Sequence, residues 1–194
     1  MIKTLLLDAD GVLQHPPSGW FAGLLERTGT TVNAEIAAVE EPFMTGGDGI
    51  VDAYTAGFPN RTVSVEELFD YWNRIVVDAV ALALIDQVRA RGVRVFLASN
   101  QQVRRAAYMR DELPFSRHLD GLFMSAELGL RKPDPAFFAR ILDETGSDPA
   151  ETLFIDDMPE NAAAARAFGL NAEQVERNSG SQGLRAILQA YDLI

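Results

Sequence analysis

The 194-residue sequence contains no cysteine and only two histidines, His15 and His118. The absence of cysteine excludes disulfides, thiolate nucleophiles and iron–sulfur ligation, and two histidines are too few for a histidine-rich metal site. A chain without cysteine also fits a reducing compartment, so we expect a cytoplasmic protein.

Basic residues are scarce, with 17 lysines and arginines against 28 acidic residues and a formal net charge of -11. This balance argues against a protein that binds nucleic acid mainly through phosphate contacts, and we expect no nucleic-acid partner. A small anionic substrate stays possible, because a site can be locally positive inside an acidic protein.

Long hydrophobic runs are also missing. The apolar run Leu5–Leu7 ends at aspartates without a cleavage site, so no signal peptide is expected. The most apolar later stretch, residues 75–88, contains Asp78 and Asp86 and is too short to span a bilayer. We therefore expect a soluble protein with no membrane partner.

Hydrophobic residues make up 47% of the chain, which is enough for a sizeable core. Short apolar runs predict strands, and the segments between them have helical patterns. Strands are expected at residues 1–7, 93–98, 121–124, 152–155 and 171–175, and helices at 79–92, 102–112, 135–145 and 160–168. This alternation predicts an α/β fold, a Rossmann-like, doubly wound parallel sheet with helices on both faces.

The stretch from residue 16 to residue 80 is different, because it has helical patterns and no convincing buried strand. Helices are expected there at residues 21–28, 34–41 and 65–77, with breaks at Gly46–Gly49 and Gly57–Pro59. We interpret it as a helical cap domain of residues 16–80 inserted into a core domain of residues 1–15 and 81–194.

Polar residues follow three of the predicted strands where each strand ends. They are Asp8 and Asp10, then Ser99 and Asn100, then Asp156 and Asp157. The carboxyl ends of parallel strands lie at one edge of a sheet, so these side chains should converge in one crevice. Four carboxylates would repel one another without a cation, and oxygen ligands select a hard ion, above all Mg²⁺. Arg131 and Lys132 can supply further positive charge for an anionic group.

Four motifs in this order resemble the haloacid dehalogenase superfamily, in its helical-cap phosphatase branch. They are LLLDADGVL at the start, LASN, ELGLRKPDPAFF and FIDDMPENAAAARAFG, and together they span residues 1–169. The resemblance implies a Mg²⁺-dependent phosphatase that hydrolyses a small phosphorylated metabolite through an aspartyl-phosphate.

The same resemblance implies a role for each motif residue. Asp8 would be the nucleophile, Asp10 the general acid and base, and Lys132 a cation for both the nucleophile and the phosphoryl group. Phosphate oxygens would be held by Ser99 and by backbone amides, those of Ala9, Asp10 and Asn100. The metal ligands would be Asp8, Asp10 through its backbone carbonyl, Asp157 and, directly or through water, Asp156.

Other interpretations remain open from the sequence. Asp8 and Asp10 could have no role beyond shaping a turn, and the other strand-end residues could have no role beyond capping the helices that follow. Arg104, Arg105 and Arg110 are expected on a solvated helix face, with a position of Arg104 near the crevice left open, and His15 is expected on the surface. A sugar-phosphate mutase is the main alternative activity, and a non-catalytic sensor of phosphorylated ligands is the other. The sequence leaves the physiological substrate and the oligomeric state open.

Overall fold

The computed structural model describes residues 1–30, 33–176 and 179–194. At its centre lies a five-stranded sheet with the strand order β5–β4–β1–β6–β7, and every neighbouring pair is parallel. The strands are β1 (Thr4–Leu7), β4 (Arg94–Ser99), β5 (Gly121–Met124), β6 (Thr152–Asp156) and β7 (Asn171–Gln174). The parallel α/β sheet predicted from the sequence is confirmed.

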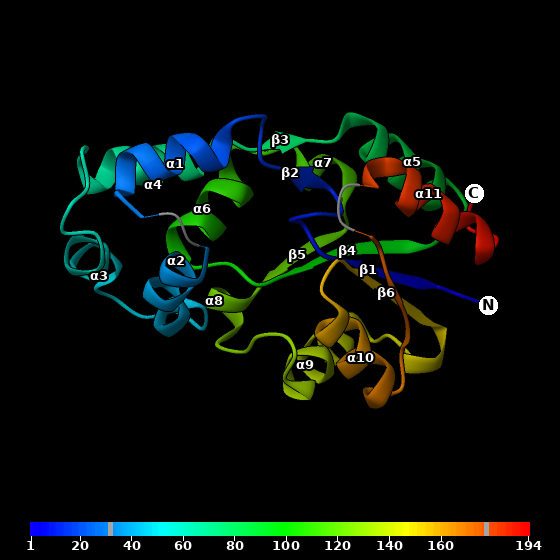
Figure 1. Cartoon of the computed structure of the whole chain (residues 1–194). Helices are drawn as coiled ribbons and strands as arrows, with labels where there is room; N and C mark the ends of the chain where they lie inside the picture. Colours follow the sequence, from blue (N-terminus) through cyan, green and yellow to red (C-terminus); the bar gives the residue numbers. More distant parts are fainter. Residues whose placement is uncertain (31–32, 177–178) are drawn as a thin grey trace.

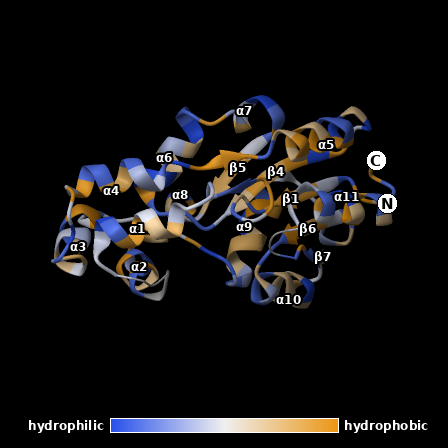
Figure 2. Cartoon of the chain, turned by 45° about the horizontal axis from the view of Figure 1, so that its top comes forward, coloured by the Kyte–Doolittle hydropathy of each residue, from blue (hydrophilic) through white to orange (hydrophobic). Residues whose placement is uncertain are grey.

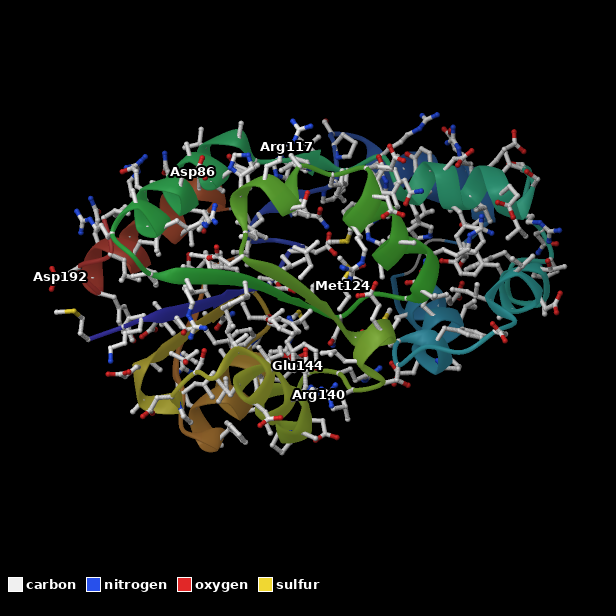
Figure 3. The ribbon with its side chains drawn as sticks, turned by 180° about the vertical axis from the view of Figure 1, so that it is seen from behind. Asp86, Arg117, Met124, Arg140, Glu144 and Asp192 are labelled. Carbon is white, nitrogen blue, oxygen red and sulfur yellow. The ribbon has the colours of Figure 1, made fainter. Side chains whose placement is uncertain are left out.

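Helices cover both faces of this sheet (Figure 1). One face carries α5 (Ala79–Ala90), α6 (Val103–Asp111), α7 (Phe115–His118) and α11 (Gly180–Ala190), and the other carries α9 (Pro135–Thr145) and α10 (Pro159–Phe168). Two short helical segments, α8 (Ser125–Leu128) and η2 (Pro149–Glu151), complete the core. Seen from behind, Asp86 of α5 and Arg117 of α7 lie on one side of the sheet, and Arg140 and Glu144 of α9 on the other (Figure 3). No helix in the described part of the chain is long and apolar enough to cross a membrane.

The alternation of side chains along the strands explains the two layers of core. Leu5 and Leu7 of β1 pack in one hydrophobic cluster with α5 and α11, whereas Leu6 packs in a second cluster with α9. All four residues of β1 are buried, as expected for a central parallel strand covered on both faces. Figure 2 shows β1, β4 and β5 as a hydrophobic centre between more polar helices.

A helical lobe, defined here as residues 20–72, lies between β1 and α5 in the sequence. It consists of α1 (Trp20–Thr28), α2 (Asn33–Glu40), η1 (Glu41–Phe43), α3 (Ile50–Gly57) and α4 (Val65–Trp72). These helices surround a hydrophobic cluster of their own that includes Trp20 and Tyr54. In Figure 1 the lobe lies beyond the carboxyl ends of the sheet strands. A small antiparallel ribbon of β2 (Gln14–His15) and β3 (Val76–Val77) joins it to the core.

The sequence-based prediction was wrong at one helix end and missed two longer helices, α3 and α11, as well as the four-residue helices α7 and α8. The helix predicted at residues 65–77 ends at Trp72, and Val76 and Val77 instead pair with β2, a role that suits β-branched residues. Helix α3 follows the glycine-rich run, and α11 begins with Gly-Ser-Gln. Glycine and serine are weak helix formers, so the start of neither helix has a clear signal in the sequence.

Truncation of Phe138 should destabilise the core strongly. This side chain is fully buried on α9 and packs edge-on against Phe154 of β6, with ring centroids 5.2 Å apart. We expect Phe138→Ala to lower the free energy of unfolding by about 3–5 kcal/mol in chemical denaturation. Phe21 on α1 is 55% exposed. The control Phe21→Ala should therefore change the free energy of unfolding by less than about 0.5 kcal/mol. Equal effects would contradict this description of the core.

Candidate active site

A cavity of about 200 Å³ opens at the carboxyl edge of the sheet. Strand ends and neighbouring loops supply its lining, and the lining residues are Asp8, Asp10, Ser99, Asn100, Lys132, Asp157, Met158 and Asn161. The structure therefore brings together side chains from all four motifs, as predicted from the strand ends. Asp156 lies beside this lining and is fully buried.

Lys132 is the central cation of the site. Its ammonium group donates hydrogen bonds to Asp8 Oδ1 at 2.8 Å and to Asp156 Oδ2 at 2.6 Å, and the side chain is 1% exposed. Asn100 fixes the main chain of this lysine, because its amide donates to the Lys132 carbonyl at 2.8 Å and its Oδ1 accepts from the Lys132 N–H at 2.9 Å. The loop before α9 is thus fastened to the end of β4.

Asp156 is surrounded by donors from the protein. Besides Lys132, Asn161 donates to both of its carboxylate oxygens at 3.1 Å, and the backbone N–H of Met158 donates to Oδ1 at 2.8 Å. Two orienting contacts per oxygen fix this carboxylate at the end of β6. Asp156 is therefore well placed to hold Lys132 in turn.

Three carboxylates form a group with the geometry of a metal site. Oxygen atoms of Asp8, Asp156 and Asp157 all lie within 4.8 Å of one another, and all three residues are buried. Gly11 packs directly against Asp157. A Cβ atom added to Gly11 would lie only 2.8 Å from Asp157 Cγ, and Gly11 has a φ of +83°. Oxygen donors alone at this spacing fit a hard divalent cation such as Mg²⁺.

The electrostatics of this group also favour a cation. Burial raises the pKa of Asp8 to about 7; Lys132 opposes this rise, whereas Asp156 and Asp10 add to it. Burial alone would favour the neutral form of Lys132, but Asp8 and Asp156 outweigh it and raise the pKa of the lysine. One ammonium group thus faces more negative charge than it can neutralise.

The carboxylate of Asp10 lies outside that group and has its own partners. Oδ1 accepts hydrogen bonds from Gln14 at 3.0 Å and from Arg105 at 3.1 Å, and Oδ2 accepts from Gln101 at 2.7 Å. The side chain of Asp10 remains 44% exposed. Two carboxylates two residues apart therefore have very different environments, one buried against a lysine and one open to the cavity.

The remaining predicted residues fall close to the site. Ser99 is buried, and its Oγ accepts a hydrogen bond from Gln101 at 3.1 Å. Ala9 is fully buried, and its carbonyl accepts from three following N–H groups, which tightens the turn after β1. Ser99 and Asn100 do not start α6: its N-cap is Gln102, whose side chain accepts from the N–H groups of Arg104 and Arg105.

Sequence reasoning misplaced two arginines and missed several polar partners. Arg105 is 6% exposed and bonded to Asp10, so it does not lie on a solvated face. Arg131 was expected to supply positive charge to the site, but it is not among the residues that line the cavity and pairs with Glu41 of the helical lobe at 2.5 Å. Residues that the sequence analysis did not single out are Gln14, Gln101 and Asn161. The position of Asn161 one turn after Asp157 was the available signal. His15 is exposed, as predicted.

Solved structures with the same fold include enzymes of one superfamily. A crystal structure of a haloacid dehalogenase family enzyme from Bacteroides thetaiotaomicron, in complex with magnesium and inorganic phosphate, superposes with a TM-score of 0.79 at 21% identity. The match covers 92% of this chain and 96% of that one. A predicted haloacid dehalogenase-like hydrolase from Porphyromonas gingivalis gives 0.81 at 21% identity, over 98% of both chains.

Relatives of similar sequence include phosphatases. The sesquiterpene phosphatase astK of Aspergillus oryzae is 35% identical over 99 residues, which cover 48% of this chain and 47% of that protein. The phosphoglycolate phosphatase of Rhodospirillum rubrum is 31% identical over 90 residues, covering 46% and 37%. The chain thus aligns with less than half the length of these relatives.

A family model described as haloacid dehalogenase-like hydrolase matches residues 2–169, which include β1, the helical lobe and the strand ends that form the cavity. Because this match covers most of the chain, the protein belongs to the haloacid dehalogenase-like hydrolase family.

Proposed function

We propose that this protein is a Mg²⁺-dependent phosphatase that hydrolyses small phosphomonoesters through an aspartyl-phosphate on Asp8. The observation that carries the proposal is the pairing of a buried carboxylate, Asp8, with Lys132, beside a second carboxylate, Asp10, in a different environment. Phosphatases among the relatives of similar sequence support the same reaction class. Cytoplasmic location stays a prediction from the sequence.

The chemistry assigned to the protein has two steps. A carboxylate oxygen of Asp8 attacks phosphorus, the ester P–O bond breaks, and Asp10 gives its proton to the departing alcohol oxygen. Asp10 then takes a proton from water as that water attacks phosphorus. The bond from phosphorus to Asp8 breaks, and inorganic phosphate is released. Lys132 offsets negative charge on Asp8 and on the phosphoryl group throughout.

The donor set fits a magnesium ion. Asp8, Asp157 and the backbone carbonyl of Asp10 would hold it, and the bound cation would supply positive charge against the phosphoryl oxygens. Asp156 already accepts hydrogen bonds from Lys132, Asn161 and a backbone N–H. We therefore assign Asp157 as the direct ligand and Asp156 mainly to the orientation of Lys132.

Phosphate recognition is assigned to Ser99 and to backbone N–H groups, those of Ala9, Asp10 and Asn100. The cavity of about 200 Å³ is smaller than the roughly 300–1,000 Å³ of pockets for drug-sized ligands, which favours a small phosphorylated metabolite. The helical lobe would act as a cap that shields the reaction from bulk water, with residues 16–80 as cap domain and residues 1–15 and 81–194 as core domain.

Loss of the nucleophile should abolish turnover. Asp8→Asn is nearly isosteric but poorly nucleophilic, so phosphate release from p-nitrophenyl phosphate should fall below a few per cent of wild type, with an unchanged circular-dichroism spectrum. Asp143→Asn, an exposed change on α9, is the control and should keep full activity. Substantial turnover by folded Asp8→Asn would remove this residue from the role.

Magnesium should stabilise the fold as well as support activity. At a free concentration one hundred times its Kd, it should add about 2.7 kcal/mol and raise Tm by on the order of 5–10 °C. Asp157→Asn should lose most of this shift, whereas Glu160→Gln, an exposed change two residues past Met158, should keep it. EDTA should stop phosphate release, and an unchanged Tm with an unchanged rate in EDTA would contradict the metal site.

Removal of the general acid should depend on the leaving group. Asp10→Asn should cost roughly 10²–10⁴ in rate on alkyl phosphates such as sugar phosphates, and much less on p-nitrophenyl phosphate, whose leaving group needs little protonation. Rates are measured as inorganic phosphate released, and isomerised sugar phosphate is followed in parallel. Equal losses on both substrates would make Asp10 structural, and isomerised product without phosphate would make the protein a mutase.

A further inference from the structure

Arg105 is a buried cation that contacts both the candidate site and the helical lobe. Its Nη2 donates to Asp10 Oδ1 at 3.1 Å, and its Nη1 donates to the carbonyl oxygen of Trp72, the last residue of α4, at 2.6 Å. The arginine belongs to α6 of the core and is 6% exposed. One guanidinium group thus joins the side chain of Asp10 to the lobe.

A second acidic residue reaches the same place from the lobe. Glu40 ends α2, is 8% exposed and accepts a hydrogen bond from the hydroxyl of Tyr54 at 2.5 Å. Burial raises the pKa of Glu40, while Tyr54, Arg105 and the side chain of Gln102 lower it and Asp10 raises it. Arg105 therefore lies within electrostatic range of one carboxylate from the core and one from the lobe.

The other two donors to Asp10 bind elsewhere within the core. Gln101 also donates to Ser99, and the amide of Gln14 also approaches the sulfur of Met109 at 3.8 Å. Among the hydrogen bonds of the described residues, Arg105 is thus the donor that ties Asp10 to the lobe. A buried charge costs free energy unless it is paired, and apolar packing would stabilise this interface equally well. Stability alone therefore does not explain an arginine at this position.

We propose that Arg105 is a positioning residue, through which the docked helical lobe fixes the carboxylate of Asp10 where the alcohol departs. The inference rests on the proposed phosphatase function and adds to it a link between the lobe and proton transfer. The planar guanidinium suits this task, since its separate N–H groups bind Trp72 and Asp10 at the same time. A lysine in its place carries the charge without that fixed fork.

Arg104 provides a matched control at the same interface. It precedes Arg105 on α6 and forms an exposed ion pair with Glu66 of α4 at 2.5 Å. Among the described residues, its side-chain contacts are with the lobe and not with the residues that line the cavity. Arg104→Met removes a bond between the core and the lobe but leaves the partners of Asp10 in place. A general loosening of the lobe would affect both variants, whereas misplacement of Asp10 would affect the Arg105 variants alone.

The test compares kcat for p-nitrophenyl phosphate and for glycerol phosphate in wild type, Arg105→Met, Arg105→Lys and Arg104→Met. Arg105→Met should lower kcat on glycerol phosphate roughly 10- to 100-fold, because misplaced catalytic groups cost about this much, and should change p-nitrophenyl phosphate turnover far less. Arg105→Lys should also lower kcat more on glycerol phosphate than on p-nitrophenyl phosphate, but the decrease should be smaller than in Arg105→Met. Arg104→Met should leave the ratio of the two rates at the wild-type value.

A second arm places Arg105→Met in the Asp10→Asn background. If the arginine acts through Asp10, the double variant should hydrolyse glycerol phosphate within about threefold of Asp10→Asn alone. A full multiplicative loss in that background, or equal losses on both substrates for the single variants, would overturn the inference. If Arg105→Met does not fold, the ratio of the rates on glycerol phosphate and p-nitrophenyl phosphate is measured in Arg105→Lys, and an unchanged ratio there would overturn the inference.

The outcomes also separate this inference from the proposed function. If the wild-type protein hydrolyses neither substrate, both the proposed phosphatase function and the role of Arg105 are wrong. Wild type that hydrolyses both, with the leaving-group effect in Asp10→Asn but an unchanged rate ratio in the Arg105 variants, would leave the phosphatase assignment standing and remove the role of Arg105.

Discussion

The site depends on one buried cation between two carboxylates. Lys132 reaches Asp8 at the end of β1 and Asp156 at the end of β6, two adjacent strands, and Asn100 at the end of β4 holds its main chain. Three neighbouring strands of the sheet are thereby fixed relative to the loop that carries the lysine. Charges this deeply buried are tolerated when they are paired, and removal of one partner leaves the others uncompensated. With Asp157 alongside, the group keeps an excess of negative charge that a cation can balance.

A short turn gives two aspartates opposite environments. Asp8 is buried against an ammonium group, and Asp10, two residues later, is 44% exposed and held by amide and guanidinium donors. The turn between them is tightened by hydrogen bonds to the Ala9 carbonyl, and Gly11 follows with a positive φ where a side chain would collide with Asp157. Carboxylates in such different surroundings are suited to different tasks, which in the mechanism we propose are attack on phosphorus and transfer of protons.

The core was predictable because local signals and tertiary structure agree there. The strand at residues 121–124 and the helix at 135–145 have the predicted bounds, and strand ends rich in aspartate predicted the crevice. The lobe was harder, since β3 exists through pairing with β2, which sequence periodicity does not reveal. Arg105 was missed for a related reason. Its neighbour Arg104 is also an arginine, and it is the docking of α4 against α6 that leaves one of them buried and the other exposed.

Two pairs of adjacent basic residues connect the lobe to the site in the same way. In each pair one cation enters the site and its neighbour binds a glutamate of the lobe; the lobe pairs are Arg104 with Glu66 and Arg131 with Glu41. Lys132 and Arg105 therefore each follow a residue whose side chain is paired with the lobe. Exposed ion pairs contribute at most about 1 kcal/mol each, so these contacts favour the docked lobe without locking it. The hydrogen bond from the buried Arg105 to the Trp72 carbonyl adds to them, so the lobe contacts the site most directly through the guanidinium group that also binds Asp10.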